Sequence, residues 1–267
     1  MNLHTVLATN NECYIRNHGT KWTPKGIMVH STAANNPYLK RYVGPDDGLL
    51  GQNQYGNTWN QYHPDGKQIC CHAFIGKLKD GTIATYQILP WDCKGWNNGG
   101  SSNNTHIAFE ICEDDRTDKA YFEKVYKEAV ELCAYLCKMY NIDVSNVIDH
   151  AEGYKKGIAS NHGDVGHWFP KFGKSMDTFR KDVTAQIKAN EAAASSGSGG
   201  KTETTGNVMY RVQVGAYKVK ANAEAMKKKL KDAGFDAIIK VDGDMDGDGK
   251  VTSADARIVS RKAAGLE

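Results

Sequence analysis

The sequence lacks long apolar runs, a strong excess of charge of either sign and the paired cysteines of a common metal site. No hydrophobic stretch in the 267 residues approaches the roughly 20 residues that a membrane-spanning helix needs, so we expect no membrane insertion. The formal net charge of +3 is too small to indicate nucleic acid as a partner. The first residues also lack the charged-then-apolar pattern of a secretory signal, so we expect the chain to fold in the cytoplasm.

The cysteines are odd in number, seven, and none of them forms a CxxC pair. Cys133 and Cys137 lie one helical turn apart on an apolar stripe, which favours buried and reduced thiols. A zinc site built from cysteines is the weaker alternative.

The length and composition fit one large globular domain and a small one, with 40% hydrophobic and 24% charged residues. The boundary is indicated by residues 191–207, EAAASSGSGGKTETTGN, which are small, polar and rich in glycine and serine. Such a composition predicts a flexible linker. We therefore expect a first domain at residues 1–190 and a small α+β module at residues 208–267.

The first domain reads as an α/β domain with a mixed central sheet flanked by helices. GIMVH and HIAFEI are typical of buried strands, and AFIG and TIATYQIL predict a hairpin that turns at Asp80-Gly81. Apolar residues on one helical stripe predict helices over 121–140 and 175–187. A polar loop at residues 34–66 carries several aromatic residues, some of which could stack on sugars while others pin the loop to the core.

Two predicted strands end in a histidine, His30 after GIMV and His150 after VID. Asp164 follows in a glycine-rich loop, and zinc in catalytic sites takes three such ligands and leaves one position for water. We therefore expect His30, His150 and Asp164 to bind one zinc ion. His162 and His167 compete with Asp164 as the third ligand, because the sequence has no compact motif such as HExxH here.

Glu110 lies in the apolar strand HIAFEI, where a carboxylate is costly unless it is paired or near a cation. A partner for a buried lysine or arginine is the alternative reading. His72, at the start of the first hairpin strand, could line a cleft or be structural, and the residues alone do not decide.

Several motifs occur together in a recognisable order: IMVHSTA, HAFIGKLKDGTIATYQILP, GWNN, HIAFE and DHAEGYKKGIASNHGDVGHWFP. Over roughly residues 20–185 the chain resembles the zinc-dependent type 2 N-acetylmuramoyl-L-alanine amidases. The family shares its fold with peptidoglycan recognition proteins and many phage endolysins. The resemblance implies a peptidoglycan hydrolase that cleaves the amide bond between N-acetylmuramic acid and L-alanine.

The resemblance also assigns roles to single residues. It implies zinc ligands at His30, His150 and Asp164 and a catalytic carboxylate at Glu110. His162 stands where the family often has a lysine that steadies the oxyanion, so it must be protonated or donate through a neutral N–H.

A second departure is Trp96-Asn97, where a Trp-His pair is common in the family. We expect His72, Trp96 and Asn97 to contact the substrate. The lack of a signal pattern suits an endolysin that is kept in the host cytoplasm until lysis and then acts on the cell wall. The alternatives are a bacterial autolysin, a non-catalytic peptidoglycan-binding protein with the same fold, and a scaffold protein whose tail docks to a partner.

The tail carries two further patterns. Residues 209–241 resemble the first half of a SPOR domain, the sporulation-related repeat that binds glycan strands. We expect the calcium-bound segment to complete this half, or two copies to pair as a homodimer, or both. DMDGDGKVTSAD fits the calcium-loop template and resembles a dockerin loop. The expected calcium ligands are Asp244, Asp246, Asp248, Lys250 and Asp255.

Overall fold

The structure is a computed structural model, and it describes residues 1–20, 22–196, 224 and 227–228. The chain divides into two units, residues 1–200 and residues 201–267, and the first is described here. The expected calcium ligands lie outside the described residues: Asp244, Asp246, Asp248, Lys250 and Asp255. Nearly all of the expected module at residues 208–267 lies outside them as well.

A six-stranded mixed sheet forms the centre of the first unit, with the strand order β1-β4-β3-β5-β2-β6. Only β3 and β4 run antiparallel, as the hairpin pattern predicted, and the other neighbours are parallel. The strands are β1 (Leu3–Thr5), β2 (Gly26–Ser31), β3 (Ala73–Lys77), β4 (Ile83–Gln87), β5 (His106–Ile111) and β6 (Val147–Asp149). The predicted α/β architecture is therefore confirmed.

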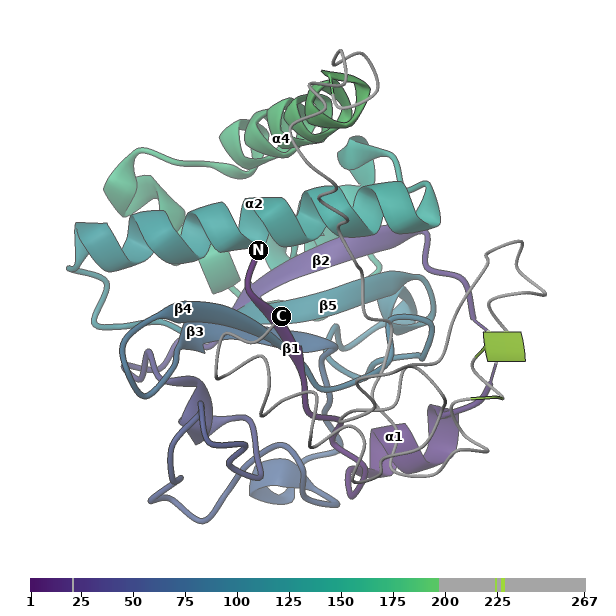
Figure 1. Cartoon of the computed structure of the whole chain (residues 1–267), viewed down its shortest axis with the longest axis vertical. Coiled ribbons are helices and arrows are strands. Elements are labelled where there is room, and N and C mark those ends of the chain that lie inside the picture. Colours follow the sequence, from purple (N-terminus) through teal and green to yellow (C-terminus); the bar gives the residue numbers. More distant parts are fainter. Residues whose placement is uncertain (21, 197–223, 225–226, 229–267) are drawn as a thin grey trace, which may run out of the picture. The chain divides into compact units, whose positions relative to one another are not determined.

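Helices α2 (Lys119–Tyr140) and α4 (Met176–Ser196) lie on one side of the sheet (Figure 1). Asp118 caps the start of α2 by accepting from the backbone N–H of Tyr121, and Asn141 ends it in the left-handed conformation. The apolar stripe of α2 packs on the odd-numbered side chains of β2 and β5, because successive side chains of a strand point to opposite faces.

Helix α4 continues to Ser196, so the first six residues of the expected linker, 191–196, are helical. The linker prediction is wrong for these residues. EAAA has a strong helix propensity, and this extends the helix that precedes it.

The opposite face of the sheet carries a second apolar cluster beneath α1 (Glu12–Asn17) and the long loop. Tyr42 and Trp59 of this loop are turned inward onto Phe74, with ring centroids 5.0 and 4.8 Å away. Tyr55 and Tyr62 are exposed. The loop aromatics thus divide between pinning the loop and facing solvent.

Seven further short helical segments of the described residues lie in the loops around the sheet, and three of them matter below. These are η3 (Ser101–Asn104), α3 (His150–Lys155) and η5 (Asp164–His167). The remaining short segments are η1 (Leu39–Arg41), η2 (Pro64–Gly66), η4 (Val144–Asn146) and η6 (Phe169–Phe172). The sequence did not predict β1, α1 or α3, because three to six residues are too few for a periodic pattern.

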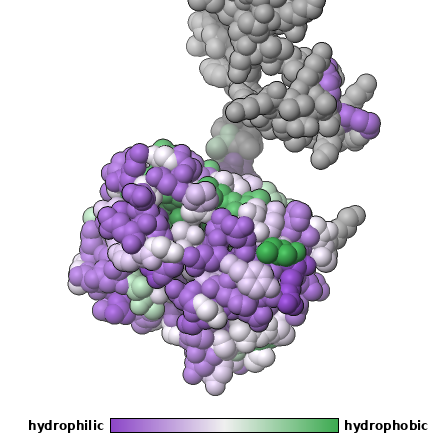
Figure 2. Space-filling model, turned by 90° about the horizontal axis from the view of Figure 1, so that it is seen from below, coloured by the Kyte–Doolittle hydropathy of each residue, from purple (hydrophilic) through white to green (hydrophobic). Residues whose placement is uncertain are grey.

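All seven cysteines are buried and unpaired, as expected from the sequence. Among the described residues, no helix is both long and apolar enough to cross a membrane. The face seen in Figure 2 is mostly hydrophilic, and its hydrophobic areas are small and separate.

Candidate metal centre

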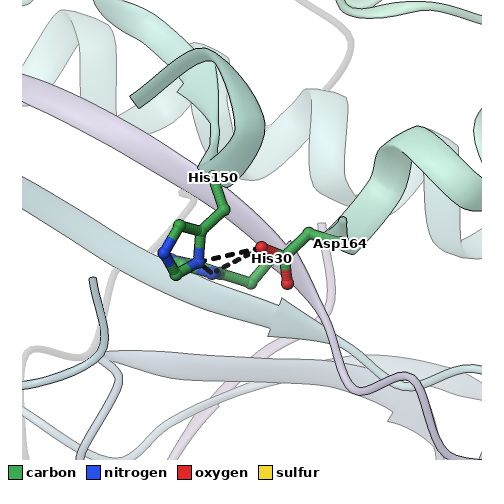
Figure 3. A group of neighbouring side chains, drawn as sticks. All are labelled: His30, His150 and Asp164. Carbon is green, nitrogen blue, oxygen red and sulfur yellow. Dashed lines mark hydrogen bonds and ion pairs between the residues drawn. The ribbon is translucent and has the colours of Figure 1, made fainter. Parts of the chain in front are cut away.

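Three side chains from separate parts of the chain converge at one edge of the sheet. His30 lies near the carboxyl end of β2, His150 is the first residue of α3 directly after β6, and Asp164 begins η5. Because β2 and β6 are parallel neighbours, their carboxyl ends lie at the same edge. Figure 3 shows the three side chains pointing toward one another, and their ligand atoms all lie within 4.8 Å.

The distances suit a small tetrahedral metal ion. Nδ1 of His30 lies 3.1 Å from Nδ1 of His150, and Oδ2 of Asp164 lies 3.5 and 2.9 Å from these two nitrogens. Ligand atoms held at 2.0–2.1 Å in a zinc tetrahedron are about 3.3 Å apart. Oδ2 of Asp164 is buried without a hydrogen-bond partner in this arrangement. Two imidazoles and one carboxylate therefore fit zinc in geometry and in donor type.

Electrostatics keep the carboxylate of this triad ionised. Burial opposes the charge of Asp164, but the imidazoles of His150 and His30 beside it outweigh burial and hold its pKa below the ordinary value. The charged form is the one that binds a metal ion.

The outer nitrogen of each histidine has its own partner. Nε2 of His30 lies 2.9 Å from Oδ1 of Asn98, and Nε2 of His150 lies 3.1 Å from the hydroxyl of Ser160. Such partners fix the tautomer and the ring orientation of a metal-binding histidine. When both outer nitrogens donate, Nδ1 of each ring is unprotonated and directed at Asp164.

Glu110 lies beside this triad on β5, in register with His30 on β2. Burial raises the pKa of Glu110 to about 7, while the neighbouring His30 and a hydrogen bond from Asn97 at 3.0 Å favour the ionised form. Its other oxygen, Oε2, is buried without a partner. A carboxyl group that titrates near neutrality and has one free oxygen suits a general base.

His162 and His167 are not members of the triad. The exposed His162 ring lies next to His150, and its Nδ1 is 3.1 Å from the hydroxyl of Ser160. His167 instead pairs with the buried Glu113 at 2.7 Å. Of the three competing residues, the structure brings only Asp164 into the cluster.

Comparison with known proteins identifies the family of this chain. A family model described as N-acetylmuramoyl-L-alanine amidase matches residues 20–167, which is more than half of the chain. The chain belongs to this amidase family.

Individual relatives are distant. A probable N-acetylmuramoyl-L-alanine amidase of Bacillus licheniformis is 24% identical over 217 residues, which cover 79% of this chain and 54% of that protein. The chain thus spans about half the length of this curated relative.

Among solved structures, the Staphylococcus aureus hydrolase AmiA in complex with its ligand is 17% identical, with a TM-score of 0.50 over 72% of this chain and 84% of that one. A mutant endolysin from Bacillus subtilis is 24% identical, with a TM-score of 0.43 over 68% of this chain and 99% of that one. The AmiA likeness shows that the amidase fold is shared.

A SPOR domain model matches residues 181–246. This match is wider on both sides than the segment 209–241 expected from the sequence, and it begins within α4.

Of the three substrate contacts expected in the amidase domain, the one at His72 is wrong. His72 is fully buried, its Nε2 bonds the carbonyl of Cys93 at 2.8 Å, and its Nδ1 accepts from the backbone N–H of Ala108 at 3.0 Å. Burial lowers the pKa of His72 to about 4, so it is a neutral structural histidine and does not line the cleft.

Trp96 is half-buried and packs on the second apolar cluster, and Asn97 contacts Glu110. The sequence interpretation missed Asn98 and Ser160, which touch the two histidines directly. The one feature of the sequence that could have indicated Asn98 and Ser160 is their position in loops rich in asparagine, glycine and serine, near a predicted ligand.

Proposed function

We propose that this protein is a zinc-dependent N-acetylmuramoyl-L-alanine amidase that cleaves the bond between the lactyl group of N-acetylmuramic acid and L-alanine. The observation that carries this proposal is the triad of His30, His150 and Asp164 with Glu110 beside it, in a chain of the amidase family. These three residues would hold the ion through two Nδ1 atoms and one carboxylate oxygen.

Zinc bound there would supply a polarised carbonyl and a water whose pKa falls to about 7. Glu110 would take the proton of the attacking water through its free Oε2 and later deliver it to the leaving amine of L-alanine. The bond from Asn97 keeps Oε1 in place, so that Oε2 has a fixed direction.

His162 is proposed to steady the oxyanion from the solvent side. When Nδ1 of His150 is unprotonated, its Nε2 carries the proton and donates to the hydroxyl of Ser160. Ser160 must then donate onward to Nδ1 of His162, so the proton of the neutral His162 ring sits on Nε2. This N–H is a donor that a developing negative charge can use.

The biological setting that we propose is lysis of a bacterial cell by an endolysin, which follows the resemblance of the sequence motifs to those of endolysin-type amidases. The SPOR match supports a wall-binding segment over residues 181–246 that holds the enzyme on glycan strands. Calcium binding at Asp244, Asp246 and Asp248, and pairing of two copies through this segment, remain predictions. Isothermal titration with calcium and sedimentation analysis would test them.

Digestion of purified cell walls tests the enzymatic proposal. We expect new amines without new reducing sugar ends, and a mass spectrum that contains muramic acid with a free lactyl carboxylate. Incubation with a chelator should abolish amine release, and added zinc should restore it. New reducing ends would indicate a glycosidase, whereas binding without any product would leave a non-catalytic wall-binding protein.

A further inference from the structure

Two consecutive residues, Asn97 and Asn98, link the proposed base to one of the proposed zinc ligands, and we call this pair the corner. Their side chains diverge. The amide of Asn97 donates to Glu110 at 3.0 Å, and the amide oxygen of Asn98 accepts from Nε2 of His30 at 2.9 Å. Any rotation of this corner therefore moves two functional groups together.

The same corner also contacts the other histidines. The carbonyl of Asn98 accepts from the backbone N–H of Ser160 at 3.1 Å. The hydroxyl of Ser160 lies 3.1 Å from both His150 and His162. Asn98 thus contacts His30 directly and His150 and His162 by way of Ser160.

One side chain holds the corner itself. Oδ1 of Asn103, in η3, accepts from the backbone N–H of Asn97 at 3.2 Å and from that of Asn98 at 2.8 Å. Asn98 is 1% exposed, so water cannot readily replace a lost acceptor there. A buried donor left without its partner costs about 1–3 kcal/mol, which favours rotation of the corner over retention of the unpaired groups.

We propose that Asn103 is a positioning residue that orients the general base Glu110 through Asn97 and the zinc ligand His30 through Asn98. It touches neither group, and it acts by fixing the backbone from which both amides project. This inference rests on the proposed function, because it assigns Asn103 a role at the same site.

The test compares variants of Asn97 and Asn98, each of which removes one of the two contacts, with a variant of Asn103, which supports both. Asn98→Ala should weaken zinc binding by roughly 10–100-fold, as loss of a ligand's outer partner does, with kcat at saturating zinc within about threefold of wild type. Asn97→Ala should leave the zinc dissociation constant within about threefold and lower kcat at least about tenfold. Asn103→Leu should produce both defects at once. Zinc affinity is measured by competition with a chromophoric chelator, and kcat by amine release.

Two further variants separate positioning from general stability. Asn103→Asp keeps an oxygen that can accept both N–H groups, so it should restore both readouts to within about threefold of wild type. Asn104→Leu is the matched control, since Asn104 is the exposed neighbour in the same helical turn, and it should change neither readout. If circular dichroism shows that Asn103→Leu does not fold, Asn103→Ser replaces it, because a serine hydroxyl is too short to reach both N–H groups.

Wild-type zinc affinity and kcat in a folded Asn103→Leu or Asn103→Ser variant would overturn the inference. So would equal losses in Asn97→Ala and Asn98→Ala for both readouts, which would indicate a loop that is only loosened. A wild-type protein that binds zinc but releases no amines would contradict the proposed function instead. In that case the zinc affinities alone would decide the role of Asn103.

Discussion

His30 and Glu110 are opposite one another on the parallel strands β2 and β5, and the backbone ladder between these strands sets their separation. The proposed metal ligand and the proposed base are therefore both placed by adjacent strands of the central sheet. The other two ligands, His150 and Asp164, come from short helical segments that begin at the same edge. The arrangement explains why one buried carboxylate can be held close to a metal site without being a ligand.

The first prediction concerns the stability of the metal-free protein. Burial raises the pKa of Glu110 from 4.5 to about 7, so the folded state retains a proton that the unfolded state has lost between these values. The free energy of unfolding then falls as pH rises through this window and levels off above about pH 7. Glu110→Gln removes the titration, and its stability relative to wild type should increase by about 2–3 kcal/mol between about pH 5 and pH 8. Urea unfolding in the presence of a chelator measures this, and a difference that does not change with pH would contradict it.

The same variant should be nearly inactive. Loss of the general base should lower kcat by about 10²–10⁴-fold, while the zinc dissociation constant stays close to that of wild type. Glu123→Gln is a suitable control, because Glu123 is an exposed glutamate of α2. Full amine release by Glu110→Gln would remove Glu110 from the mechanism.

A third prediction separates the competing zinc ligands. Asp164→Ala should weaken zinc binding by more than the roughly 10–100-fold that loss of an outer partner costs. His162→Ala should lower kcat but leave zinc affinity within about tenfold, since the ring contacts Ser160 and His150 and is not one of the three converging ligands. His167→Ala should leave the ligand set intact. Zinc titration of all three variants by calorimetry would decide, and the reverse order for Asp164 and His162 would refute the assignment.

The fourth prediction compares two glycines that both have a positive φ. Gly99 has φ +64 and Gly157 has φ +72, so alanine is strained at either position. A Cβ on Gly99 would overlap the hydroxyl of Ser160, whereas a Cβ on Gly157 would meet open space. Each substitution should cost about 1–2 kcal/mol of stability from the backbone alone.

Only Gly99→Ala should also reduce zinc affinity, because it displaces the hydroxyl that orients His150. Thermal unfolding and zinc competition on both variants give the comparison. Equal zinc affinities in the two would show that the position of Ser160 is unimportant for the ligand.

The sequence predicted the central sheet and two of the ligands for one physical reason. Short apolar runs such as GIMVH are typical of strands buried on both faces, and a polar residue at the end of such a strand lies at an open sheet edge. This logic places His30 and His150. Asp164 and Glu110 needed the additional evidence of motif order, because a loop carboxylate and a strand carboxylate each have several structural explanations.

Other features depend on loop conformation, which residue types do not encode. His72 was expected in the cleft, but its burial follows from the way the segment around Cys93 folds back over it. Within Asn97, Asn98 and Asn103, the direction of each amide is set by the turn that connects them, so three residues of one type have three different partners. The extension of α4 over 191–196 differs from the linker that the composition predicts, because the alanines of EAAA continue the helix into the segment that serines and glycines mark as a linker.

The proposed ligand triangle consists of nitrogen and oxygen, and all seven sulfhydryl groups are enclosed elsewhere in the domain. Peroxide and alkylating agents attack thiolates, and this site offers them none. A metal ion held by these three residues should therefore stay bound under oxidising conditions that would release it from a cysteine-ligated centre, such as the contents of a ruptured cell exposed to air.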